Sequence, residues 1–409
     1  MKTERAYFSV AVTPKAEAAV RRGHPWVYDA EITAVSGAPE NGGYVDVLGK
    51  KGQYLGTGFF SGASKIRVRL LTRNANDRLD AAFWERKLRW AWEYRKTVLA
   101  PEDLDACRII FGEADAFPGL TVDKFHDLLC VQVLSAGMER VKGELLPLLA
   151  RILREDGQEV RGVYERNDAA LREKEGLTKY KGWFVLPDEA PPERAVTEIV
   201  ENGVKYLVDV ENGQKTGFFL DQKYNRRAVA RLAKGRTVLD CFTHTGSFAL
   251  NAALGGAKHV TAVDVSEAAV ELARANVEWN GLSGVVDCVA ANVFDLLPAL
   301  EKEPSRYDFI ILDPPAFTKS RKTVVNAMSG YKEINYRAMK LLPRGGYLAT
   351  CSCSHFASEE KFIAMLEAAA KDANVRLRQI EARQQSADHP ILWGVEETNY
   401  LKFYLFQVV

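Results

Sequence analysis

Cysteine is scarce in this sequence, and no pattern typical of structural zinc is present. The six cysteines are scattered over 409 residues, except for Cys351 and Cys353, and there is no paired CxxC set. Tetrahedral zinc sites need such pairs, and a disulfide framework needs densely spaced cysteines. The sequence therefore predicts free thiols in a reducing compartment and no metal site.

Long hydrophobic runs are also missing. No apolar stretch approaches the roughly 20 residues that a membrane span needs. The basic segment 1–5 is not followed by the apolar core of a secretion signal. We therefore expect a cytoplasmic protein that has no membrane association. With 47% hydrophobic and 27% charged residues, the chain can bury a sizeable core, and its length predicts two or three domains.

Charge is balanced overall but unevenly distributed. The net charge is +1, yet residues 1–75 hold eleven Lys/Arg and six Asp/Glu, a net charge of +5, which leaves −4 for the remainder. A basic N-terminal module on a near-neutral body favours a polyanionic partner. A solvated surface with a chance excess of charge is the alternative.

Residues 1–75 are predicted to form an all-β module. Short β-branched runs such as 44–48 and 66–71 are separated by Gly and Asn. Residues 21–28 form a compact basic and aromatic cluster, Arg-Arg-Gly-His-Pro-Trp-Val-Tyr. We interpret Trp26 as a core residue and expect the basic face of the module to carry its binding role.

Residues 76–190 are predicted to form a small α/β domain. An amphipathic helix is expected over 80–99, and strands and a second helix follow at 128–134, 138–154 and 160–165. Three carboxylates in its loops and strands could suggest a metal or acid/base site, although turn carboxylates are the simpler interpretation. They are Glu113, Asp115 and Asp123.

The remaining residues, 191–409, are predicted to form the catalytic domain. An Asn-Gly turn at 202–203 indicates a hairpin over 197–210. From 237 onward, buried strands alternate with helices, as in a parallel α/β sheet. The strand 237–240 ends in Asp240, and the strand 261–264 ends in Asp264.

The loop between these two strands bears on the cofactor. An acid at the end of the second strand can accept hydrogen bonds from both hydroxyls of a ribose. The loop 241–248 holds a single glycine, Gly246, and no GxGxxG. A dinucleotide pyrophosphate needs those glycines for close backbone approach, so their absence argues against NAD. A cofactor with ribose and adenine but no phosphate fits better, and S-adenosylmethionine is such a cofactor.

Two further strands end in reactive groups. The apolar run 309–312 is followed by Asp313 and a Pro-Pro pair, and the run 347–350 is followed by Cys351 and Cys353. Ligands of open α/β sheets sit outside the carboxyl ends of the strands. A carboxylate and a thiol at two such ends could therefore face one pocket.

These motifs together resemble a known family. The segment with Gly-His-Pro-Trp (23–26) and Gly-Thr-Gly-Phe-Phe (56–60) looks like a PUA domain, a small RNA-binding barrel, and the last half resembles the class I methyltransferase fold. The whole chain is similar to the RlmI-type rRNA methyltransferases. The matching stretches are 23–26, 111–113, 118–123, 216–226, 240–248, 313–317, 352–354 and 388–390.

The resemblance implies an α/β protein with a Rossmann-like methyltransferase sheet, preceded by an all-β PUA barrel and a small α/β middle domain. It implies S-adenosylmethionine as the cofactor, held by residues of the matching stretches and of the strand ends. These are Gln222, Asp240, Phe242, Thr245, Gly246, Ser247, Asp264, Asn292 and Asp313. Two positions depart from the family pattern: Asn292 stands where Asp is usual, and His244 stands where Tyr is expected.

The implied reaction is methylation of cytosine C5 in large-subunit rRNA. C5 is a poor nucleophile until a thiolate adds at C6, and an acid must hold the base edge as charge develops. We expect Cys353 and Asp313 in these roles, with Cys351 as the alternative nucleophile. For RNA contacts we expect Arg21, Arg22, His24, Lys319 and Arg321; a solvated loop is an equal alternative for the last two.

Two other functions remain open at this point. An amino-directed methyltransferase acting on guanine N2 would need no thiol. A non-catalytic RNA-binding assembly factor would keep the fold alone, and Asn292 is the one feature that favours it. The sequence does not identify the modified nucleotide or the oligomeric state, and a homodimer is kept as an alternative to a monomer.

Overall fold

The computed structural model describes residues 7–302, 307–318 and 323–409. It divides into two compact units, each built from segments that are separate in the sequence. Unit 1 holds Met1–Ile199, Leu207–Leu220 and Ala387–Thr398, and unit 2 holds Val200–Tyr206, Asp221–Ser386 and Asn399–Val409.

Unit 1 begins with a six-stranded sheet in the order β2-β6-β5-β4-β1-β3. Its strands are β1 (Phe8–Val12), β2 (Trp26–Tyr28), β3 (Ile32–Ser36), β4 (Tyr44–Leu48), β5 (Tyr54–Phe60) and β6 (Ile66–Thr72). All pairs are antiparallel except β1 with β4. Buried valines such as Val10, Val47 and Val68 form its core, so the β-branched runs of the sequence form strands as predicted.

The all-β prediction for this module missed one helix. Helix α1 (Pro14–Arg22) starts at Thr13, whose hydroxyl accepts from the Ala16 N–H, and it ends at Gly23 with a φ of 117°. Proline at the first helical position and a left-handed glycine after the last turn are standard helix boundaries. These signals were present in the sequence, but the short, polar helix has few apolar positions to reveal its period.

A second sheet in unit 1 has the order β11-β10-β9-β8-β7. Its strands are β7 (Ala106–Phe111), β8 (Leu120–Phe125), β9 (Leu128–Val133), β10 (Gly162–Asn167) and β11 (Tyr180–Phe184), and its helices are α2 (Ala81–Val98) and α3 (Ala136–Glu155). Asp80 caps α2 by accepting from the Phe83 N–H. The predicted helices and strands of this region are all present, within a few residues of their expected bounds.

The predicted hairpin consists of β12 (Val196–Glu201) and β13 (Val204–Asp209). Asn202 and Gly203 have φ angles of 54° and 82°. Both values are positive, as a tight two-residue hairpin turn requires.

Unit 2 is organised around a seven-stranded sheet in the order β16-β15-β14-β17-β18-β20-β19. The strands are β14 (Thr237–Cys241), β15 (His259–Asp264), β16 (Val286–Ala290), β17 (Phe309–Leu312), β18 (Tyr347–Ser352), β19 (Leu377–Arg383) and β20 (Lys402–Val408). The first five strands in this order are parallel, whereas β20 runs antiparallel to its neighbours. This sheet confirms the predicted Rossmann-like architecture.

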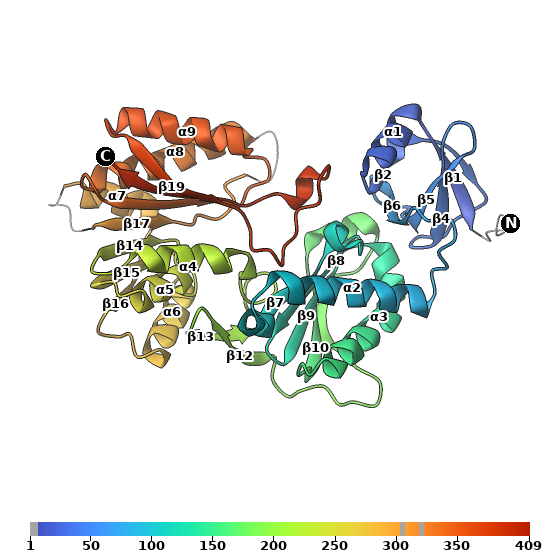
Figure 1. The fold of residues 1–409 in the computed structure, drawn as a ribbon, viewed down its shortest axis with the longest axis horizontal. Coiled ribbons are helices and arrows are strands. Elements are labelled where there is room, and N and C mark those ends of the chain that lie inside the picture. Colours follow the sequence, from blue (N-terminus) through green and yellow to red (C-terminus); the bar gives the residue numbers. More distant parts are fainter. Residues whose placement is uncertain (1–6, 303–306, 319–322) are drawn as a thin grey trace. The chain divides into compact units, whose positions relative to one another are not determined.

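Helices cover both faces of the sheet (Figure 1). Helices α7, α8 and α9 lie on one face, and α4, α5 and α6 lie on the other. Their bounds are α4 (Lys223–Leu232), α5 (Ser247–Leu254), α6 (Glu267–Trp279), α7 (Val293–Leu300), α8 (Val324–Leu341) and α9 (Glu359–Asp372). Buried side chains such as Ile310, Tyr331 and Phe362 fill the layer between the sheet and α8 and α9.

Several structural features that the sequence raised can be checked within the described ranges. All six cysteines fall in these ranges and none is in a disulfide. In the same ranges, no three His, Cys, Asp or Glu side chains gather into a group that could hold a metal ion. No helix of the described chain has both the length and the apolar character needed to cross a membrane.

A buried arginine in unit 1 provides a test of the fold. Arg95, fully buried, donates to both oxygens of Asp115 at 2.6 and 2.8 Å and to the backbone oxygens of Arg108 and Asp388. We expect Arg95→Met to lower the free energy of unfolding by about 3–5 kcal/mol, because it leaves the Asp115 carboxylate buried without its cation.

Urea titration followed by tryptophan fluorescence measures this, since six of the seven tryptophans lie in unit 1. Arg89→Met on the same helix is the control. The ion pairs of Arg89 with Glu85 and Glu155 are exposed, so its loss should cost less than about 1 kcal/mol. Equal losses in the two variants would contradict this assignment.

Candidate active site

The predicted site residues of unit 2 gather at the carboxyl ends of its parallel strands. Strand β14 pairs with β15 on one side and with β17 on the other, so the order of the strands reverses between β14 and β17. Open α/β sheets bind their ligands at such a switch point, outside the carboxyl ends. Asp240 and Asp313 lie at the ends of these two strands.

Asp240 is completely buried and incompletely paired. Its Oδ2 accepts from the Thr243 hydroxyl at 2.5 Å and from the Ala249 N–H at 3.0 Å. Its Oδ1 has no hydrogen-bond partner among the described residues. Burial raises the pKa of Asp240 to about 7, and the negative charges of Asp313 and Asp264 add to this. A buried acceptor of this kind is costly unless a ligand donates to it.

The loop after β14 has a strained backbone. Phe242 and His244 have φ angles of 65° and 50°, and Gly246 has 80°. Left-handed non-glycine residues cost free energy and cluster at functional sites. At Gly246 an added Cβ would lie 3.3 Å from the Cβ of Ala273, so both its φ and its close packing favour glycine. The result is a tight loop whose Thr243 and His244 N–H groups donate to Val263 and Asp264 at the end of β15.

Asp264 is the acid at the end of β15. Its Oδ2 accepts from the His244 N–H at 2.9 Å and its Oδ1 from the Ser266 N–H at 3.0 Å, and the side chain remains partly exposed. A carboxylate has further lone pairs, so this one can still accept from a ribose diol. Burial lowers the pKa of His244, which favours its neutral form.

Asn292 lies beside Asp264, because the Ala291 N–H donates to the Asp264 backbone oxygen. Its side-chain oxygen caps helix α7 by accepting from the Phe294 N–H at 3.0 Å. Thr245, in the loop, and Ser247, the first residue of α5, are buried, and the Thr245 hydroxyl has no partner within the described chain. These polar groups next to Asp264 suit the ribose and adenine of a nucleoside cofactor.

Asp313 connects the cofactor end of the site to the thiols. Gln222 donates from Nε2 to its Oδ1 at 3.0 Å, and the Cys351 thiol is also hydrogen-bonded to it. Burial raises the pKa of Asp313 to about 6, and the negative charge of Asp221 contributes. About a tenth of this carboxyl group is therefore still protonated at pH 7, far more than for an ordinary aspartate.

The two cysteines lie in different environments. Cys351 is the fifth residue of β18 and is fully buried, and burial raises the pKa of its thiol well above the ordinary value. Cys353 follows the last residue of the strand and is partly exposed. The charge of a Cys353 thiolate acts on Lys402, Tyr331 and Cys351, so the cysteine is near all three.

Lys402 is a buried cation that the sequence analysis missed. Strand β20 pairs Lys402 with Ser352, and its Nζ donates to the Ser354 backbone oxygen at 2.7 Å. Burial lowers its pKa to about 8. A single lysine heading the apolar run 402–406 was a signal that could have been noticed, but its neighbour depends on antiparallel pairing of the last strand.

None of the residues predicted to contact RNA is among the described residues of unit 2. Arg21 is exposed and paired with Glu17, and His24 Nδ1 lies 3.3 Å from the Trp26 backbone N–H. Arg22 is exposed. All belong to unit 1, whereas Lys319 and Arg321 lie outside the described residues. Trp26 is half-buried rather than in the core, and its indole N–H donates to Glu113.

The three middle-domain carboxylates have structural partners instead of a common site. Glu113 accepts from Trp26, and Asp115 pairs with Arg95. Asp123 pairs with Arg108 and accepts from the Thr216 hydroxyl at 2.6 Å.

Comparison with known proteins identifies the class of protein to which this fold and site belong. A family model for S-adenosylmethionine-dependent methyltransferases matches residues 189–407, and one for a PUA-like domain matches residues 10–73. A Streptococcus mutans protein described as an S-adenosylmethionine-dependent methyltransferase has the same fold, with a TM-score of 0.80 at 23% identity over 98% of this chain and 100% of that chain. The fold and the site thus define an S-adenosylmethionine-dependent methyltransferase.

More specific relatives cover nearly the whole chain. A protein of Erwinia tasmaniensis is 38% identical over 96% of this chain and 97% of its own length, and one of Aeromonas salmonicida is 40% identical over 94% and 96%. Both are named "Ribosomal RNA large subunit methyltransferase I". The chain belongs to the ribosomal RNA large subunit methyltransferase I family, which confirms the resemblance seen in the sequence, and S-adenosylmethionine is its cofactor.

The raised pKa of Asp240 leads to a prediction about stability. Between about pH 4 and pH 7, Asp240 is protonated in the folded protein and ionised in the unfolded chain. Because the unfolded chain binds fewer protons, the free energy of unfolding falls as the pH rises through this window. Asp240→Asn removes that penalty. The stability of the variant relative to the native protein should increase by about 2–3 kcal/mol from pH 5 to pH 8.

We expect Asp240 to accept a hydrogen bond from the cofactor, and Asp240→Asn removes that carboxylate acceptor. Calorimetric titration with S-adenosylmethionine at pH 8 should show about ten-fold weaker binding or worse, since a charge-assisted hydrogen bond is lost. A stability difference that does not change with pH, or unchanged affinity, would show that Asp240 does not have this role.

Proposed function

We propose that this protein methylates C5 of a cytidine in large-subunit rRNA, through a covalent bond between Cys353 and C6 of the base. The observation that carries the proposal is the meeting of a protonatable acid, Asp313, and two thiols at the ends of adjacent strands β17 and β18. The names of the relatives and the PUA-like segment support large-subunit rRNA as the substrate.

The environments of the cysteines favour Cys353 as the nucleophile. A thiolate, not a thiol, attacks, so the nucleophile needs access and a nearby cation. Cys353 is partly exposed and has Lys402 close by, whereas Cys351 is buried beside a carboxyl group that disfavours its ionisation. We therefore assign attack to Cys353 and a packing role to Cys351.

Asp313 can act as the general acid of the proposed reaction. A carboxyl group that is partly protonated near neutral pH can donate to N3 of the cytosine as the thiolate adds. Gln222 orients the carboxyl group by donating to its Oδ1. When bound, S-adenosylmethionine supplies the methyl group from its sulfonium.

In the proposed reaction, the bond between the Cys353 sulfur and C6 first forms and later breaks. The sulfur of Cys353 forms a bond to C6, which makes C5 electron-rich enough to take the methyl group. A general base then removes the proton from C5, the C5–C6 double bond re-forms, and the C6–S bond breaks to release the thiolate. N3 returns its proton to the Asp313 carboxylate, which completes the cycle. A base within folded rRNA must leave its stack to enter such a site.

Cysteine replacement tests the proposal. Purified protein is incubated with deproteinised large-subunit rRNA and S-adenosylmethionine, and the digested nucleosides are measured by mass spectrometry. We expect 5-methylcytosine from the native protein, a loss of at least about 1,000-fold in rate for Cys353→Ala, and measurable activity for the matched control Cys351→Ala.

The other candidate functions predict different results. Methylguanosine, or full activity in Cys353→Ala, would contradict the thiol mechanism. Loss of activity in Cys351→Ala alone would move the nucleophile to that residue. An absence of both S-adenosylmethionine binding and any methylated nucleoside would favour an assembly factor.

Lys402 gives a second test, as a residue that positions charge beside the nucleophile. In Lys402→Met the thiolate loses its nearby cation, so activity at pH 7 should fall about ten-fold or more and recover in part at higher pH. The acid limb of the pH–rate profile should move upward by about one unit. Lys402→Arg keeps the charge and should restore most of the shift, whereas a loss that is equal at every pH would indicate a purely structural role.

A further inference from the structure

Unit 1 contains a pocket of about 740 Å³ that the proposed mechanism does not use. One wall comes from the N-terminal sheet, with Trp26 and Arg69, and the other comes from the second sheet and its connections, with Phe111 and Glu175. Val395, from the segment Ala387–Thr398, closes one side. The volume lies in the range of pockets that bind small molecules or nucleotide units.

Three of the sequence motifs that the active site leaves unexplained meet in this pocket. They are Gly-His-Pro-Trp, Phe-Gly-Glu and Pro-Gly-Leu-Thr, which contribute Trp26, Phe111 with Glu113, and Gly119 with Thr121 to its walls. The indole N–H of Trp26 donates to Glu113 at 2.9 Å, which ties the two walls together. Trp26 and Phe111 are both half-buried and present ring surface to the pocket.

A buried ion pair with two unused polar atoms lines the same space. Arg69 and Glu175 are 7% and 2% exposed, and Arg69 donates to Glu175 Oε1 at 2.8 Å. Arg69 Nε and Glu175 Oε2 have no hydrogen-bond partner in the part of the chain that the structure describes. Buried orphan groups are expensive, and each one needs an explanation. Both atoms are closed off from solvent in the structure, so they act as one donor and one acceptor toward a ligand only after a small rotation of the two side chains.

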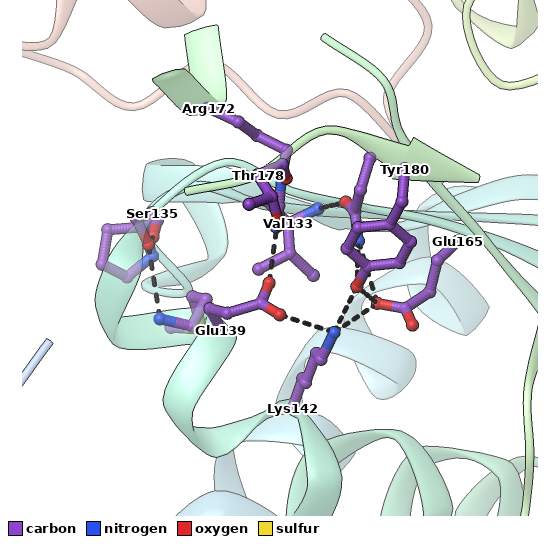
Figure 2. Close-up of polar contacts among 11 residues, drawn as sticks. Val133, Ser135, Glu139, Lys142, Glu165, Arg172, Thr178 and Tyr180 are labelled. Carbon is purple, nitrogen blue, oxygen red and sulfur yellow. Dashed lines mark hydrogen bonds and ion pairs between the residues drawn. The ribbon is translucent and has the colours of Figure 1, made fainter. Parts of the chain in front are cut away.

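The wall that carries Glu175 is held rigidly (Figure 2). The short helix η4 (Ala170–Glu175) contains Arg172, which is buried and donates to the Val133 and Thr178 backbone oxygens and to Glu139. Glu139 also pairs with Lys142, which extends the network to Glu165 and Tyr180. Glu139, Lys142, Glu165, Arg172 and Tyr180 each have at least one polar partner in this network, which holds η4 in place.

These features specify the chemistry of a ligand. Aromatic surface favours a flat ring, and a donor beside an acceptor favours a ring edge that carries both. The pocket is lined by both basic and acidic side chains, so its charges nearly cancel and a free anion is not attracted strongly. The basic residues are Lys65, Arg69 and Lys174, and the acidic residues are Glu113, Glu175 and Glu397. Lys65 and Lys174 are exposed and can reach a phosphodiester. A nucleobase attached to an RNA backbone meets all of these conditions.

We propose that this pocket binds an unpaired base of the substrate RNA, separate from the cytidine that is methylated. The inference rests on the proposed function, because it takes RNA as the substrate. Each base presents a donor and an acceptor on its edge, so Glu175 and Arg69 favour a base over an apolar group without choosing among the four. The pocket thereby selects RNA in which a second base is unstacked.

Ultraviolet cross-linking tests the pocket directly. The full-length protein is irradiated with deproteinised large-subunit rRNA, digested, and searched by mass spectrometry for peptides that carry a nucleotide. We expect adducts on the peptides that contain Trp26 or Phe111. Leu171→Trp, at the pocket wall, should reduce the adduct yield and the RNA affinity about ten-fold, because it competes with a stacking interaction of roughly 1–3 kcal/mol.

Leu254→Trp is the matched control, since both leucines are 48% exposed and Leu254 does not line the pocket. Thr121→Trp, deeper in the pocket, gives a second blocking variant. The proposal is overturned if no adduct forms on either aromatic peptide, or if both blocking variants give the same yield as the control. Adducts in a protein that makes no 5-methylcytosine would support the pocket and reject the proposed reaction, so the two failures are distinct.

Discussion

A fully buried carboxyl group, Asp240, and a partly buried one, Asp313, at the ends of neighbouring strands are the constraint on which the site depends. Asp240 is the fourth residue of β14 and Asp313 directly follows β17. Burial raises the pKa of Asp240 to about 7 and that of Asp313 to about 6. A protein keeps such groups at a cost in stability. In our proposal, Asp240 holds its unsatisfied oxygen for the cofactor, and the protonated fraction of Asp313 donates to the target base.

Much of this site was predictable because strand ends are visible in the sequence. Apolar runs that stop at Asp240, Asp264 and Asp313 indicated the strand ends, and the geometry of parallel sheets places such ends along one edge. The sequence could not choose between Cys351 and Cys353, because the choice depends on where β18 stops. The strand ends at Ser352, which buries the first thiol and leaves the second partly exposed.

Other features depended on contacts between distant segments. Lys402 lies near Cys353 because β20 turns back antiparallel to β18, which no local pattern predicts. Helix α1 was missed although Thr13, Pro14 and Gly23 mark its ends, because polar residues dominate its surface. Asn292, a departure from the family pattern, caps helix α7 while remaining beside Asp264.

The central claim is that the Cys353 sulfur bonds to C6 of a cytosine, and trapping that bond tests it most directly. In rRNA transcribed with 5-fluorocytidine triphosphate, C5 of the target cytosine carries fluorine in place of hydrogen. After methyl transfer no proton can be removed from C5, so the C6–S bond cannot break. With S-adenosylmethionine present, the account predicts a protein–RNA adduct that survives denaturation and maps by mass spectrometry to Cys353. An adduct on another residue, or none from a protein that methylates ordinary rRNA, would contradict it.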